Sequence, residues 1–152
     1  MQAAPPVRQR RKEGIAARQA AVERAEAYVH AHPDTRAPVH TVCRIVGLSE
    51  RGLRNAFYKV RGMSPQQWMF EARLQSVRRA LNDANERQTT VTSVAIGYGF
   101  YELGRFAARY RKAFGEAPSE TLRNAGRSTA AEHQGEQKEH VHAVTNEGLS
   151  AS

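Results

Sequence analysis

The sequence predicts an all-α protein in which two similar helical lobes are joined by a connecting helix and flanked by disordered tails. Apolar residues recur at helical spacing through the middle of the 152-residue chain, and glycine and proline interrupt this pattern at intervals. No stretch alternates apolar and polar residues in the way that indicates a strand. One arrangement of aromatic, glycine and proline residues also occurs twice, which indicates that one helical unit is used twice.

The helices are placed by the apolar spacing and by the breaks between apolar segments. They are expected at about residues 17–31, 39–46, 50–61, 65–82, 91–98 and 102–113. Ser49 is expected to cap the helix that follows it. Ser64 followed by Pro65 is typical of a helix start, because proline lacks an N–H that the first helical position does not need.

The two ends of the chain differ in composition from the middle. Residues 1–16 are rich in arginine and poor in apolar side chains, so we expect a basic disordered arm, and residues 126–152 are expected to form a disordered polar tail. The domain between them covers residues 17–125 and divides into a first lobe at about 17–63, a connecting helix at about 65–82 and a second lobe at about 85–125.

The charge of the chain favours a polyanionic partner. There are 23 Lys and Arg residues against 15 Asp and Glu residues, a net charge of +8, and residues 126–152 are themselves net negative. No apolar run approaches the roughly 20 residues that cross a bilayer, and the N-terminus has no apolar signal segment. The single cysteine, Cys43, excludes an intramolecular disulfide. We therefore expect a cytoplasmic protein with no membrane partner.

The repeated arrangement predicts two helix-turn-helix units. Each copy has a short helix, a turn with glycine, and a longer helix whose apolar residues lie four apart and which ends before a glycine and a proline. Corresponding residues are 52 apart before the turn and 53 apart after it. The matched pairs are Val42 and Val94, Cys43 and Ala95, Gly47 and Gly99, Leu53 and Phe106, Phe57 and Tyr110, Gly62 and Gly115, and Pro65 and Pro118.

These units, with the helix in "SPQQWMFEARLQSVRRAL" and the segment "GYGFYELGRFAARYRKAFGEAPSETLR", resemble the DNA-binding domain of the AraC/XylS family of bacterial transcription regulators. The resemblance covers about residues 18–125. It implies a bilobed helical domain in which one recognition helix from each lobe enters successive major-groove faces of double-stranded DNA. It also implies a bacterial transcription regulator.

The length of the connecting helix is compatible with this arrangement. About 18 residues span about 27 Å at the rise of an α-helix, close to the roughly 34 Å that separates successive major-groove faces. One chain could therefore bind an asymmetric site as a monomer. The chain could be a stand-alone regulator, a detached DNA-binding domain or the product of a truncated gene.

In the first lobe, the base-reading candidates are the polar residues opposite the apolar stripe of helix 50–61. Leu53, Phe57 and Val60 are expected to be buried, which turns the opposite face outward. The candidates for base contacts are Arg51, Arg54 and Asn55, and the resemblance implies the same positions. Arginine can pair with guanine O6 and N7, and asparagine with adenine N6 and N7. The competing interpretation is that these are ordinary solvent-exposed polar residues.

The second lobe departs from the family pattern. Its expected buried stripe consists of Leu103, Phe106, Ala107, Tyr110 and Phe114. The positions at which the family places long polar readers fall on Gly104 and Ala108, so Arg105 is the best remaining base reader. Three interpretations stay open. The lobe docks mainly through cations, the small residues allow a close approach with Ala108 touching a thymine methyl group, or the face makes no base contact.

Contacts to the DNA backbone are expected to be more widely spread. Three helix N-termini and several cations or polar side chains could meet phosphates. These candidates are Thr41, Arg44, Tyr58, Lys59, Arg61, Ser64, Thr92, Arg109, Arg111 and Lys112. The arginines of the N-terminal arm could follow a phosphate track or could simply keep the chain soluble.

The sequence indicates no enzyme, cofactor or metal site. It has no glycine-rich phosphate loop and no catalytic arrangement of serine or cysteine with histidine, and His140 and His142 lack a third ligand at suitable spacing. The alternative to a DNA-reading function is a helix-turn-helix module that binds proteins and has weak or non-specific affinity for DNA. RNA polymerase is a candidate partner in either case.

Overall fold

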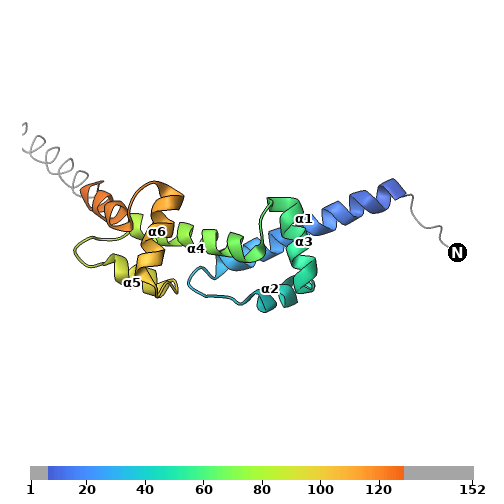
Figure 1. The fold of residues 1–152 in the computed structure, drawn as a ribbon, viewed down its shortest axis with the longest axis horizontal. Coiled ribbons are helices and arrows are strands. Elements are labelled where there is room, and N and C mark those ends of the chain that lie inside the picture. Colours follow the sequence, from blue (N-terminus) through green and yellow to red (C-terminus); the bar gives the residue numbers. More distant parts are fainter. Residues whose placement is uncertain (1–6, 129–152) are drawn as a thin grey trace, which may run out of the picture. The chain divides into compact units, whose positions relative to one another are not determined.

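The computed structural model describes residues 7–128 and is all-helical over that range, with no strand. The helices are α1 (Val7–Ala31), α2 (Val39–Val46), α3 (Glu50–Arg61), α4 (Pro65–Asn82), α5 (Val91–Gly97) and α6 (Leu103–Phe114), as Figure 1 shows. A further helix follows α6 over residues 118–128. The predicted all-α fold is confirmed, and the ends of α2 to α6 lie within one residue of the expected ends.

Two expectations about the ends of the domain are wrong. The basic segment expected to be disordered is helical from Val7 onward, because α1 begins there rather than at residue 17. The helix over residues 118–128 was not expected, and it takes in the first residues of the supposed polar tail. Residues 1–6 and 129–152, which include His140 and His142, lie outside the described part of the chain.

The chain divides into two compact units, and the boundary lies between Ser76 and Val77 inside α4. Each unit contains one copy of the repeated sequence. The first has α2 and α3 with the preceding α1, and the second has α5 and α6 with the helix that follows them.

The core of the first unit is formed by α1, α2 and α3. Their buried residues are Ala21, Val22 and Ala25 from α1, Val42, Cys43 and Val46 from α2, and Leu53, Ala56 and Phe57 from α3. Trp68 and Met69 of α4 pack against this cluster. Burial raises the pKa of the Cys43 thiol, and the charge of Glu50 adds to the effect. Cys43 is therefore a small core residue and not an activated thiol.

The turn between α2 and α3 depends on a glycine and a serine. Gly47 has a φ of 72°, in the left-handed region, and its N–H donates to the carbonyl of Cys43 at 2.9 Å. The side chain of Ser49 then accepts a hydrogen bond from Gly52 N at 3.1 Å, which confirms the predicted cap of α3. Ser64 caps α4 in the same way, through Gln67 N at 3.2 Å.

The second unit is built around two aromatic residues of α6 and a buried polar network. Besides Phe106 and Tyr110, the buried residues of this unit include Val77 and Leu81 of α4, Ala95 of α5, Phe100 of the turn before α6 and Leu122 of the last helix. The ring of Phe106 contacts those of Phe100 and Tyr110, at centroid distances of 5.0 and 5.7 Å. The hydroxyl of Thr121 donates to Glu116 at 2.6 Å, so the 2.9 Å hydrogen bond between Thr121 and Tyr110 is one in which Tyr110 donates. This network joins α6 to the helix over residues 118–128.

Candidate nucleic-acid interface

The exposed face of α3 brings the three base-reading candidates of the first unit together. Leu53, Ala56 and Phe57 are almost fully buried, and this burial fixes the rotation of the helix. Arg51, Arg54 and Asn55 are all exposed on the opposite side. Because positions three and four apart share a helix face, these three side chains lie side by side. Two further candidates, Tyr58 and Lys59, are exposed one turn later on the same helix.

One cation of α3 is already paired. The guanidinium of Arg61 donates to both carboxylate oxygens of Glu26 in α1, at 2.6 and 2.7 Å. This two-point contact neutralises much of the charge of Arg61 and joins the end of α3 to α1. A phosphate would have to displace Glu26, so Arg61 is the weakest cationic candidate on this helix.

The candidates at the helix starts differ in their availability. Thr41 is half-buried in the first turn of α2, and Arg44 of that helix is exposed. The hydroxyl of Ser64 is already used as the cap of α4. At α5, Thr90 is the capping residue and its side chain accepts from Ser93 N at 3.1 Å, while Thr92 is exposed beside it.

The exposed face of α6 differs from the expected one. Phe106 and Tyr110 are buried and Phe114 is half-buried, but Leu103 is 37% exposed and Ala107 is also exposed. The expectation that Leu103 and Ala107 belong to the buried stripe is therefore wrong. Leu103 begins the helix, where few neighbours cover it, and the stripe that packs on the rest of the unit is too narrow to include Ala107.

The two second helices can be matched position by position, because each begins three residues before its first buried anchor. Glu50 and Leu103 start the helices, and Leu53 and Phe106 are the anchors. Gly104, Ala107 and Ala108 then occupy the places of Arg51, Arg54 and Asn55. All three are exposed, so the polar face of α3 is replaced on α6 by a small and largely apolar one. When the two helices are matched at their buried anchors, Ala107 corresponds to the exposed Arg54, and this correspondence places Ala107 outside the core.

Cations surround this face of α6. The exposed basic residues are Arg105, Arg109, Arg111 and Lys112. Arg105 forms an ion pair with Glu102 at 3.1 Å, but its side chain is 83% exposed, so the pair is weak and exchangeable. The segment between α5 and α6, residues 98–102, is two residues longer than the segment 47–49 between α2 and α3, and its Tyr101 is exposed.

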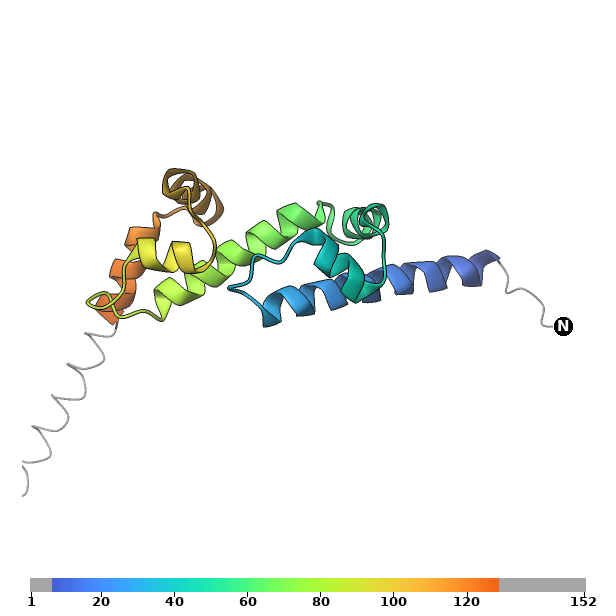
Figure 2. The same cartoon turned by 90° about the horizontal axis from the view of Figure 1, so that it is seen from below.

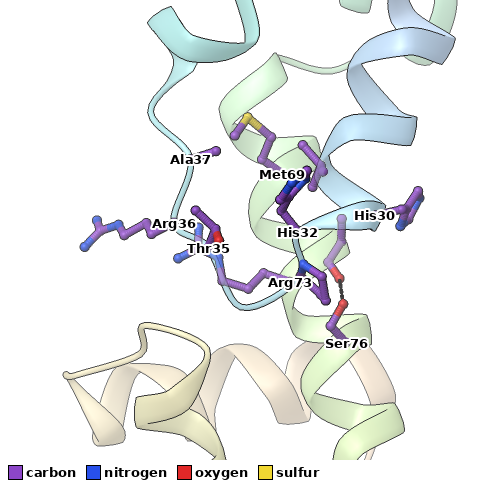
Figure 3. Close-up of a pocket in the computed structure, with 11 residues that line it drawn as sticks. His30, His32, Thr35, Arg36, Ala37, Met69, Arg73 and Ser76 are labelled. Carbon is purple, nitrogen blue, oxygen red and sulfur yellow. Dashed lines mark hydrogen bonds between the residues drawn. The ribbon is translucent and has the colours of Figure 1, made fainter.

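A small hollow lies in the first unit. Figure 3 shows it between the end of α1, the loop that follows and α4, lined by residues that include His32, Thr35, Arg36, Arg73 and Ser76. His32 Nδ1 is hydrogen-bonded to the carbonyl of Tyr28 at 2.8 Å, and the Ser76 hydroxyl donates to Ala72 at 3.1 Å. Burial lowers the pKa of Arg73, and the nearby charge of Arg36 lowers it further. Two polar groups of the lining are thus already used within the protein.

Comparison with known proteins identifies the family. A family model described as a helix-turn-helix domain matches residues 42–124. A crystal structure of a probable AraC family transcriptional regulator from Rhodopseudomonas palustris CGA009 shares 40% sequence identity. That match covers 69% of this chain and 96% of the other, with a TM-score of 0.63. The chain belongs to the AraC/XylS family.

Other AraC/XylS relatives are longer proteins. The XylDLEGF operon transcriptional activator of Pseudomonas putida is 35% identical over 108 residues, which are 71% of this chain and 34% of the relative. The probable thc operon regulatory protein of Rhodococcus erythropolis is 38% identical over 96 residues, 63% of this chain and 29% of the relative. The chain thus spans about a third of the length of these curated relatives. Members of this family are transcription regulators rather than enzymes.

Two further features of the described part of the chain concern membranes and metal ions. No helix between residues 7 and 128 is long and apolar enough to cross a membrane. No group of three or more His, Cys, Asp or Glu side chains in that range could hold a metal ion.

The pairing of Arg61 with Glu26 leads to a prediction about stability. Arg61→Ala should lower the free energy of unfolding by about 1 kcal/mol, because it leaves the partly covered Glu26 carboxylate without its partner. Lys59→Ala, on the same helix, is the matched control and should leave urea unfolding unchanged. Equal effects of the two substitutions would contradict the structural role of the ion pair.

Proposed function

We propose that this AraC/XylS-family chain is a sequence-specific, double-stranded DNA-binding transcription regulator. One recognition helix from each lobe, α3 and α6, enters successive major-groove faces. The observation that carries the proposal is the face of α3, where Arg51, Arg54 and Asn55 lie together in solvent while the opposite face holds the helix on the core. The two similar operon regulators described above, both named as such, support the assignment to transcription.

In the first lobe, α3 reads base edges directly. The two arginines can each pair with guanine O6 and N7, and Asn55 can pair with adenine N6 and N7. Tyr58 and Lys59, one turn later, are placed to contact phosphates, which position a protein without specifying sequence. The side chains of Arg44 and Thr41 on α2 extend the set of backbone contacts.

In the second lobe, α6 binds through a different combination of forces. Arg105, Arg109, Arg111 and Lys112 supply charge for phosphates, and Arg105 is the best placed for a base. Ala107 and Ala108 present methyl groups where α3 has arginine and asparagine. Apolar side chains contact the 5-methyl group of thymine in the major groove, so α6 favours thymine at these positions.

A protein-binding role is the second candidate, and one observation favours it. Leu103, Ala107 and Ala108 form an exposed apolar surface, and such surfaces also suit contacts with other proteins, such as RNA polymerase. The cations around this surface favour DNA, because DNA phosphates can pair with them, whereas an uncharged protein partner would leave them unpaired.

The assignment of Arg51 as a base reader is tested by comparing two substitutions. On the preferred duplex, Arg51→Ala should cost about 1–3 kcal/mol of binding free energy and relax the preference at one base pair. Lys112→Ala should weaken binding to preferred and random duplexes alike, because it removes a phosphate contact. Fluorescence anisotropy on both duplexes measures the two effects. Equal losses for Arg51→Ala on both duplexes would show that it does not read a base.

The thymine contact of α6 is tested by removing the methyl group from the DNA. Replacing thymine by deoxyuracil in the part of the site bound by α6 should cost about 0.8 kcal/mol per contacted methyl, roughly a fourfold loss of affinity. The same replacement should have a smaller effect on the Ala108→Gly protein, which lacks one of the two contacting methyl groups. Unchanged affinity of the unmodified chain for the deoxyuracil duplex would rule out methyl recognition and leave α6 as a cationic anchor.

A further inference from the structure

The first half of α1 lies outside the core of its unit. Figure 2 shows this part of the helix continuing beyond α2 and α3, which cover only its second half. The first buried residue of α1 is Ala21, and the side chains before it are exposed or half-buried, including Ile15 at 55%. This segment, residues 7–20, also precedes the range that the family model matches.

The segment is strongly basic. It holds five cations, Arg8, Arg10, Arg11, Lys12 and Arg18, against one carboxylate, Glu13, a net charge of +4. None of the ion pairs found within residues 7–128 involves these cations. Four cations in five successive positions concentrate positive charge on this part of the helix, and Arg8 lies three and four residues before Arg11 and Lys12, at spacings where like charges repel.

We infer that residues 7–20 form a third DNA-binding element, which follows the phosphate backbone of duplex DNA without reading its sequence. The inference rests on the proposed function, since the two recognition helices bring the DNA to the chain. Phosphates would neutralise the repulsion between neighbouring cations, so the same contact that binds DNA also stabilises this part of the helix.

The charge decides the partner of this segment. A second copy of the chain would bring two segments of charge +4 together, and the apolar residues Val7 and Ile15 are too few to offset that repulsion. Duplex DNA attracts the segment instead, because binding of each cation to a phosphate releases a condensed counterion. The resulting gain in binding free energy depends on salt concentration and not on base sequence.

The test is the salt dependence of DNA binding by the full chain and by a variant with Arg8→Gln, Arg10→Gln, Arg11→Gln and Lys12→Gln. Glutamine keeps the helix propensity and removes the charge. The slope of log affinity against log salt should fall by about 3 to 4, as expected for four lost phosphate contacts. The change should be the same on the preferred duplex and on a random one, and the urea unfolding midpoint should not move.

A control variant separates this effect from a general loss of charge. Arg123→Gln with Arg127→Gln removes two exposed cations from the last described helix and should leave the slope nearly unchanged. An unchanged slope in the four-residue variant, while the full chain still prefers its site, would overturn the inference and leave the proposed function standing. A full chain that binds no duplex would overturn both.

Discussion

The rotation of the second helix in each helix-turn-helix unit depends on two buried side chains one turn apart. Leu53 and Phe57 hold α3, and Phe106 and Tyr110 hold α6, and all four are at most 3% exposed. Full burial of such a pair is worth about 3–6 kcal/mol, so a rotation that exposed it would cost much of the stability of a small unit. The face that α3 or α6 offers to a partner is therefore fixed by the core and not by its own polar residues.

Because the anchors are shared, the two units keep one geometry while their exposed faces differ. The counterparts of Arg51, Arg54 and Asn55 on α6 are a glycine and two alanines, and the cations of α6 lie beside them. In the proposed function, the first unit forms directional hydrogen bonds with base edges, whereas the second binds through shape, methyl contacts and charge. That proposal divides specificity and affinity between two copies of one fold. Arg61, which is paired with Glu26, has a structural role within the first unit.

The sequence predicted the regular parts of this fold well, because their signals are local. Gly47, Ser49 and Pro65 mark turns and helix starts by their own chemistry, and the spacing of Leu53 and Phe57 marks the buried face. The predicted exposure of Arg51, Arg54 and Asn55 is confirmed for the same reason.

The features that the sequence did not reveal depend on neighbours distant along the chain or on intrinsic propensity. The width of the buried stripe on α6 is set by what packs against it, so the apolar spacing within α6 alone did not reveal the exposure of Leu103 and Ala107, although their match to Glu50 and Arg54 in the repeat indicates it. The helix at 118–128 begins at Pro118, the residue that matches Pro65, so a local start signal is present, and Thr121 holds this helix through its link to Tyr110. The first half of α1 lacks an apolar face, and its high charge and low apolar content led to the expectation of disorder. Its arginine, glutamine and alanine residues nevertheless favour a helix, and the segment is helical from Val7.

Selection of preferred sequences from a random duplex library by the purified chain tests the central claim most directly. The account predicts an enriched site with two parts about one helical turn apart, the part bound by α3 showing guanine and adenine preferences and the other a weaker one. A pool that stays random after repeated rounds, under conditions where the chain is folded, would contradict sequence-specific reading.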